Sequence, residues 1–411
     1  MTQTNYLCKV IRTLKGIKTV HWKMVTPLKI EKKMLKAIQK LPQLENLHLH
    51  FGHGITRLAI APRFNLSLKT ISLVEPQGRC TKIAEVRLVS DDIHSFLASC
   101  PFVETLNIAS VLHYPVKFSD VVKDLPHQHN FHPSLTSLRL RNVILSPSPT
   151  DVKYLANLQS LDIRQCDENI WTAFRLSGIR LKTLEISQVT LQLVEYLLHY
   201  RGLEEFYFIA QHDLSKANPE AKYRLFQSVL PHHQDCLRAF HIQLHCGWLH
   251  IPENVHLANT WCLDDTQICC LRGLPHLKTL GVSFFGDHPP APGKGILVTL
   301  EEALNAILSF TNQLETVYLN AVAVVQPGIR GRVVNLPEIV RMLRNEIASL
   351  ESSSSHSSSA RKELDLIIQA GLSPAWGTRL VQYNMKTNLW GDAVNAPGES
   401  RLIEFMPLLK H

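Results

Sequence analysis

The sequence predicts an α/β solenoid, in which short parallel strands stack side by side and a helix or loop follows each strand. The first supporting observation is a repeated spacing of apolar residues. It occurs as Leu155-x-x-Leu158-x-x-Leu161-x-Ile163, Gly178-x-x-Leu181-x-x-Leu184-x-Ile186 and Tyr200-x-x-Leu203-x-x-Phe206-x-Phe208. The last apolar positions of these stretches lie 23 and 22 residues apart, which fits units that pair one strand with one helix.

The second observation is the alternation inside each stretch. Leu161 and Ile163 point to one side of a strand and Asp162 to the other, as in a half-buried strand. One such strand cannot bury its apolar side alone, but stacked neighbours share a core. The pattern therefore predicts a leucine-rich-repeat solenoid (horseshoe), with parallel strands on the concave face and helices and irregular loops on the convex face.

The same strand template recurs along most of the chain. Its first copy is Leu14-x-x-Ile17-x-x-Val20-x-Trp22 and its last clear copy is Leu314-x-x-Val317-x-Leu319. The copies between them end in the apolar pairs Leu47 and Leu49, Ile71 and Leu73, Leu106 and Ile108, Leu138 and Leu140, Phe240 and Ile242, and Leu280 and Val282. Ile83-x-x-Val86-x-Leu88 follows too soon for a full repeat and predicts an extra strand or hairpin.

Helices are expected between several of these strands. Residues 28–38 are apolar at helical spacing and carry lysines on the other face. These lysines either form a nuclear-localisation or polyanion-binding patch or line the solvent side of a repeat helix. Thr190 is expected to open a helix over 191–198, and another helix is expected after Asp264-Asp265.

The pattern divides the chain into a solenoid over residues 1–326 and a C-terminal capping segment over 327–411. A capping segment is expected because the exposed end of a solenoid must be covered. Residues 352–359 are almost all serine and predict a mobile loop. Residues 364–368 form either one further strand or a helix.

The positive charge of the chain is concentrated at its beginning. Residues 1–40 contain ten Lys or Arg and one acid, a net charge of +9, within a chain of net charge +8. The other 371 residues hold 33 basic and 34 acidic side chains, a net charge of −1. The body of the chain is therefore not expected to bind nucleic acid.

The compartment expected for this chain is the cytoplasm or nucleus. Nine cysteines, an odd number, occur without the apolar stretch of a secretory signal, which favours reduced thiols. No stretch is apolar for long enough to predict a membrane span.

The strongest chemical candidate is the stretch 232–276, which is rich in histidine and cysteine. Four such side chains around one ion would make a zinc site and a metal-binding regulator or enzyme. No C-x-x-C pair is present, and Phe240 and Ile242 assign the middle of the stretch to a repeat strand. The sequence therefore favours ordinary repeats, predicts neither an enzyme nor a cofactor, and leaves the metal-binding regulator as the alternative.

Several units begin with x-Pro, as in Leu41-Pro42, Cys100-Pro101, His132-Pro133 and Leu274-Pro275, and one ends in Cys166 where many leucine-rich repeats place Asn. Over residues 14–320 this pattern resembles the leucine-rich domains of F-box-type proteins, especially divergent fungal ones. The resemblance implies a substrate-recognition subunit, in which the repeats hold a protein while an N-terminal F-box docks a cullin-ligase adaptor. Because the first repeat begins at Leu14, the given sequence leaves no room ahead of it for an F-box of about 40 residues, which was either lost or lies upstream of Met1, and this chain as given is expected not to co-purify with that adaptor.

A protein partner is expected on the concave face of the strands. The side chains predicted to point there come from the positions between, or just after, the apolar pairs of each strand. They are Asn107, Arg139, Arg141, Asp162, Arg164, Glu185, Tyr207, Ile209, His241 and Gln243. Arginine and tyrosine are common anchors of interfaces, and an exposed Ile209 beside Tyr207 would favour a bound partner.

Overall fold

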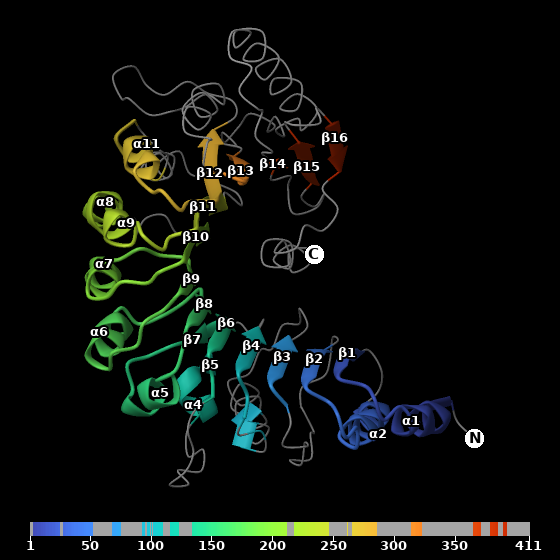
Figure 1. Ribbon diagram of the computed structural model, residues 1–411. Helices are drawn as coiled ribbons and strands as arrows, with labels where there is room; N and C mark the ends of the chain where they lie inside the picture. The colour runs from blue at the N-terminus through green and yellow to red at the C-terminus, as the bar shows by residue number, and fades with distance from the viewer. Residues whose placement is uncertain are drawn as a thin grey trace, which may run out of the picture. The chain divides into compact units, whose positions relative to one another are not determined.

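The computed structural model describes residues 3–24, 28–51, 68–74, 93–94, 97–98, 100, 102–109, 116–122, 134–211, 218–245, 261, 265–285, 314–322, 365–370, 379–384 and 389–392. The chain forms two compact units, Met1–Thr183 and Leu184–His411, whose helices and strands are labelled in Figure 1. None of the described helices is long and apolar enough to cross a membrane.

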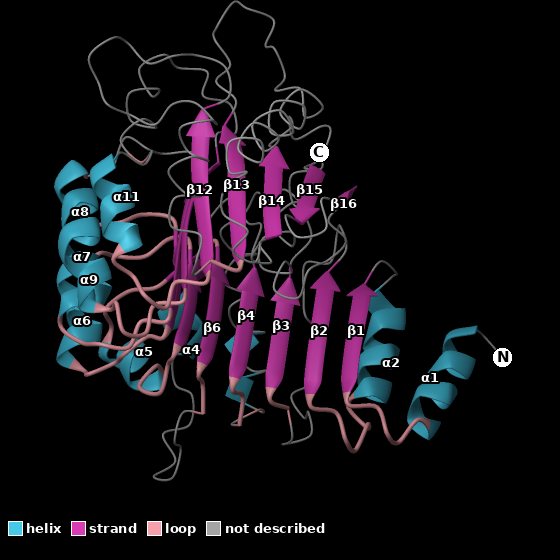
Figure 2. Cartoon of the chain, turned by 45° about the horizontal axis from the view of Figure 1, so that its top comes forward, coloured by secondary structure: helices cyan, strands magenta, loops and turns pink. Residues whose placement is uncertain are grey.

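The main sheet of the first unit consists of parallel strands that neighbour one another in the order in which they occur along the chain. They are β1 (Thr19–Met24), β2 (Asn46–Phe51), β3 (Thr70–Val74), β4 (Thr105–Ala109), β6 (Ser137–Arg141) and β8 (Ser160–Ile163). Figure 2 shows the arrows of β1 to β4 running side by side in one direction. Stacked parallel strands in chain order are the arrangement of a solenoid, in which each repeat contacts its neighbours.

The register between repeats is fixed where each strand begins. One backbone carbonyl of each repeat accepts two N–H donors from the next repeat: Lys18 accepts from Glu45 and Asn46 at 2.8 and 2.9 Å. The same arrangement returns at Gln159, whose carbonyl accepts from Lys182 and Thr183 at 2.7 and 3.1 Å. This repeated contact keeps equivalent residues of successive strands directly opposite one another.

Helices and a small second sheet complete the first unit. The helices are α1 (Gln3–Thr13), α2 (Leu28–Ile38), α4 (Phe118–Val122), α5 (Pro149–Tyr154) and α6 (Asn169–Leu176). Strands β5 (Val116–Lys117) and β7 (Val143–Ile144) pair in parallel outside the main sheet. Helix α6 ends at Leu176, and Gly178 follows its C-cap Ser177 with a φ of 69°, the left-handed conformation that commonly terminates helices.

The second unit repeats the parallel arrangement and then reverses it. Strands β9 to β14 follow in chain order, and β15 and β16 are added in antiparallel pairing. They are β9 (Thr183–Ile186), β10 (Glu205–Gln211), β11 (Ala239–His245), β12 (Thr279–Phe285), β13 (Thr316–Val322), β14 (Asp365–Ala370), β15 (Arg379–Asn384) and β16 (Leu389–Asp392). Residues 365–370 therefore form a strand, one of the two possibilities that the sequence left open.

The helices of the second unit lie on one side of its strands (Figure 1). They are α7 (Leu191–Leu198), α8 (Pro219–Arg224), the π-helical segment η2 (Leu225–Val229), α9 (Leu230–His232) and α11 (Asp265–Arg272). Helix α7 begins as predicted at Thr190, whose hydroxyl accepts a hydrogen bond from the backbone N–H of Leu193 at 3.2 Å.

The core of each unit contains the apolar positions of the strand template. Leu161 and Ile163 are buried in the first unit, and Leu184 and Ile186 in the second. The α/β leucine-rich-repeat fold and the predicted strand positions are therefore confirmed, as is the helix over 28–38. The sequence did not predict α1, β5, β7, β15 or β16.

Some predictions concern residues outside those that the structure describes. These are the extra strand or hairpin over 83–88 and the mobile loop over 352–359. The boundary proposed at residue 326 stays a prediction.

Candidate functional site

A row of polar side chains crosses the main sheet of the first unit. We call the six side chains that form it the polar row: His21, His48, Ser72, Asn107, Arg139 and Asp162. Each lies directly opposite the next in the parallel register, and each sits between two apolar positions of its strand. Since side chains alternate along a strand, the polar row lies on the face opposite the apolar core. We call this side of each sheet the open face.

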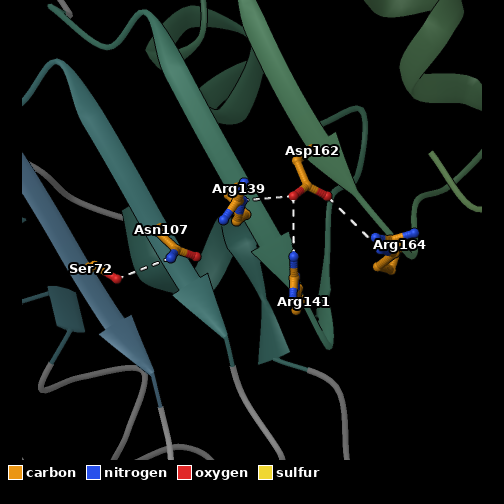
Figure 3. Close-up of polar contacts among 6 residues, drawn as sticks. All are labelled: Ser72, Asn107, Arg139, Arg141, Asp162 and Arg164. Carbon is orange, nitrogen blue, oxygen red and sulfur yellow. Dashed lines mark hydrogen bonds and ion pairs between the residues drawn. The ribbon is translucent and has the colours of Figure 1, made fainter. Parts of the chain in front are cut away.

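Neighbours in the polar row contact one another. The Asn107 amide Nδ2 donates a hydrogen bond to Ser72 Oγ at 3.0 Å (Figure 3). The rings of His21 and His48 stack with centroids 4.2 Å apart and planes inclined by 3°. These contacts restrict the rotamers of the side chains, so the row presents donors and acceptors in a defined arrangement.

Three arginines surround the last member of the row. Arg139 Nε lies 2.7 Å from Asp162 Oδ2, Arg141 Nη2 lies 3.6 Å from the same oxygen, and Arg164 Nε lies 3.9 Å from Asp162 Oδ1. We call these four residues the arginine cluster (Figure 3). Its side chains are only 5–20% exposed, so these ion pairs are less screened by solvent than surface pairs.

An aromatic row lies at the equivalent position in the second unit. The register places Tyr207 opposite His241, His241 opposite Gly281, and Gly281 opposite Tyr318. The His241 ring contacts both tyrosines, with centroids 4.7 Å from Tyr207 and 5.0 Å from Tyr318. The imidazole therefore bridges β10 and β13 above the strand that carries Gly281.

Burial keeps His241 neutral. Desolvation lowers the pKa of this imidazole to about 3, because a charged ring would have to leave water. Its Nε2 atom is buried and has no hydrogen-bond partner among the residues that the structure describes. The ring therefore acts as an aromatic spacer between two tyrosines.

Gly281 provides the space that His241 occupies. A Cβ atom at position 281 would lie 2.7 Å from Cγ of the imidazole, well inside contact distance. We predict that Gly281→Ala destabilises the chain by roughly 1–3 kcal/mol in urea unfolding, because the ring must leave its position between the tyrosines. In a His241→Ala background the same substitution should cost much less, and equal costs in the two backgrounds would contradict this contact.

The structure corrects one expectation about the open face. Ile209 was expected to be exposed, but it is buried, with only 3% of its surface exposed. Asp162, Glu185, His241 and Gln243 are also buried. Strands in a sheet lie only about 4.8 Å apart, so side chains opposite one another on adjacent strands shield each other from solvent. Ile209, for example, lies directly opposite Gln243. Asn107, Arg139, Arg141, Arg164 and Tyr207 are partly exposed, and the binding role of all ten predicted residues stays a prediction.

Sequence reasoning missed members of both rows. His21, His48 and Ser72 in the first unit and Gly281 and Tyr318 in the second occupy the same position between two apolar residues. Extending the rule that selected Asn107 to the first and last strands would have found them.

The stretch 232–276 is partly described. Within the residues given coordinates here, no group of three or more His, Cys, Asp or Glu is placed to hold a metal ion. His233 bonds to the backbone of Leu197 and Leu203, and His241 belongs to the aromatic row. Cys246, His250, His256 and Cys262 lie outside the described residues.

Comparisons with known proteins give a likeness of fold. No protein-family model matches the sequence, and no curated protein matches it. An internalin of Listeria monocytogenes is 14% identical, covering 76% of this chain and 88% of its own, with a TM-score of 0.37. A leucine-rich-repeat protein of Leptospira interrogans is 14% identical, covering 78% and 83%, with a TM-score of 0.33. Both scores are low, so the fold assignment relies on the strand order and register of this chain.

Proposed function

We propose that this chain is a protein-interaction module whose partner binds the open face of the first unit. The observation that carries the proposal is the arginine cluster beside the polar row. The backbone N–H and C=O groups of a parallel sheet form hydrogen bonds with neighbouring strands, so a partner on this face is recognised through side chains. The cluster and the row offer guanidinium, amide, hydroxyl and imidazole groups in fixed register.

The arginines suit this role because guanidinium groups are planar and present several donors in a fixed geometry. Arg139 and Arg141 keep side-chain exposures of 20% and 12%, so a partner can contact part of each side chain. Asp162 holds both side chains before the partner arrives, which lowers the entropy cost of binding.

The experiment is an affinity purification from native lysate with a double variant, Arg139→Ala/Arg141→Ala. We expect the variant to recover the main partner at least tenfold less than the wild type, since arginine anchors often contribute about 2 kcal/mol each. Thermal unfolding must first show that the variant is folded.

The matched control is Lys153→Ala/Arg175→Ala, which removes two positive charges from α5 and α6. This control should recover the partner as the wild type does. Equal recovery of every partner by the wild type and the Arg139→Ala/Arg141→Ala variant would place the binding site elsewhere.

The finer role that we propose is substrate recognition related to that of F-box proteins. The x-Pro starts of several repeats and the Cys166 repeat ending support it. The same purification tests this role, because a cullin adaptor recovered in stoichiometric amount would place the chain within a ubiquitin ligase. Purification of a partner without any cullin adaptor would instead indicate a chain that recruits a protein without forming that ligase.

A further inference from the structure

Helix α1 carries an apolar face that the fold leaves uncovered. Tyr6 is 65% exposed, Leu7 is 44% exposed and Leu14, one turn beyond Val10, is 47% exposed. Among the residues whose exposure is described, six large apolar side chains are strongly exposed, and these are three of them. Single exposed apolar residues are normal, but three within nine positions form a patch.

Part of the apolar surface of α1 is already packed. Cys8 is buried against Met34 and Ala37 of α2, with Cys8 Sγ 3.3 Å from Met34 Sδ, and Ile11 packs on the same cluster. With 3.6 residues per turn, Cys8 points away from Tyr6 and Leu7, whereas Ile11 is the i+4 neighbour of Leu7. The exposed patch is therefore the part of the apolar surface of α1 that lies beside the packed cluster and that α2 does not cover.

The surroundings of the patch are strongly basic. Lys9, Arg12 and Lys15 are exposed in or just after α1, and Lys33 and Lys36 are exposed on α2. Residues 1–40 hold ten basic side chains and one acid. Lys18 forms a surface ion pair with Glu45 at 3.8 Å. This one pair does not balance the charge of the region, which stays strongly positive.

We propose that the exposed apolar patch at α1 (Tyr6 and Leu7, with Leu14 directly after the helix) docks an acidic amphipathic helix of a protein partner, at a surface separate from the arginine cluster. The apolar residues of that helix would cover the three side chains, and its carboxylates would face Lys9, which neighbours Tyr6 on the helix, and Lys15, which follows Leu14. An apolar centre with a charged rim is the usual anatomy of a protein interface. A helix suits this patch because its three side chains are spread over about two turns.

Charge and size favour this occupant over two others. A second copy of the chain would bring its own ten basic side chains against the first, and like charges across an interface repel. An anionic membrane would receive only three apolar side chains from an 11-residue helix whose other face is packed. Helices that lie in membrane interfaces bury a whole apolar face.

The test uses the full chain and a fluorescein-labelled synthetic helix with leucine at positions i, i+3, i+4 and i+7 and glutamate on its remaining face. Fluorescence anisotropy should show saturable binding that weakens as sodium chloride is raised, because salt screens the charges. A matched peptide with lysine in place of glutamate should bind at least about tenfold more weakly.

Variants locate the site. Tyr6→Gln/Leu7→Gln should weaken binding of the glutamate peptide by about tenfold or more, and Lys9→Gln/Lys15→Gln should reduce both affinity and salt dependence. The control is Leu176→Gln/Tyr223→Gln, which removes two equally exposed apolar side chains, 80% and 65% exposed, from α6 and α8. Its affinity should equal that of the wild type.

Three outcomes would overturn the proposal. The first is equal binding of the glutamate and lysine peptides, or of wild type and Tyr6→Gln/Leu7→Gln. The second is binding of the chain to vesicles of phosphatidylcholine and phosphatidylserine, if Tyr6→Gln/Leu7→Gln abolishes vesicle binding but leaves peptide binding intact. That result would make the patch a membrane contact. The third is a dimer in sedimentation that this variant dissociates, which would make it a self-association surface.

Discussion

Replacing Leu184 with aspartate is expected to unfold much of the second unit at room temperature. Leu184 is completely buried on β9, with Leu181 and Ile186 buried on the same side. The substitution removes an apolar side chain and places an unpaired carboxylate in the core. Burying such a group costs several kcal/mol, which is comparable to the total stability of many domains.

Urea unfolding followed by circular dichroism measures this effect. The matched control is Arg180→Asp, which places the same carboxylate at an exposed position of the same repeat. The control should change the free energy of unfolding by about 0.5 kcal/mol or less. An unchanged unfolding midpoint for Leu184→Asp would show that the repeat register described above is wrong.

The strands were predictable because their signal is local and repeated. Leu161 and Ile163 must both reach the core, while Asp162 between them must not, and no helix satisfies that alternation. Each further copy of the template, down to Val317, has the same spacing of apolar residues within the strand, although the interval between copies varies. A stack of such strands has few alternative arrangements, so a pattern within one repeat predicts the whole sheet.

Other features could not be predicted because they depend on contacts far apart in the sequence. The His241 ring fits over Gly281, and nothing near either residue indicates the other. Helix α1 precedes the first copy of the strand template, so the repeated spacing gives no indication of it. The buried state of Ile209 depends on neighbouring strands, whereas the alternation within its own strand predicts exposure.

The open face combines a feature that the sequence predicts with one that it does not. The repeat period of 23 residues places Arg139 opposite Asp162, so their proximity follows from the template. The convergence of Arg141 and Arg164 on the same carboxylate depends on side-chain rotamers, which no spacing determines. The sequence could therefore predict which residues share this face but not that they form one ion-pair cluster.

A second large effect is expected at His233, which links α7 to β10. Its Nδ1 atom accepts a hydrogen bond from the backbone N–H of Leu203 at 3.3 Å. Its Nε2 atom lies 3.0 Å from the carbonyl oxygen of Leu197 and therefore carries the proton and donates. The imidazole is buried, so both backbone groups depend on it, and only the neutral ring can satisfy both.

This arrangement makes stability depend on pH in a defined direction. Burial lowers the pKa of His233 to about 4 from its ordinary value of 6.5. Between these two values the unfolded chain binds a proton that the folded chain does not, so stability rises with pH. The contribution is complete above about pH 6.5 and is lost as the pH falls toward 4. It amounts to roughly 3 kcal/mol, and the lowered pKa of His241 acts in the same direction.

We predict that His233→Ala costs about 3 kcal/mol at pH 7.5, because a buried N–H and a buried carbonyl both lose their partner. His232→Ala, which removes the neighbouring half-buried ring, should cost about 1 kcal/mol or less at that pH. The decisive measurement is the difference in unfolding free energy between wild type and His233→Ala at several pH values. That difference should shrink as the pH falls from about 6.5 to 4.5, since the wild type loses the contribution that the variant never had. A difference that stays constant over this range would mean that His233 only fills space, and that its neutral form is not what holds Leu197 and Leu203 together.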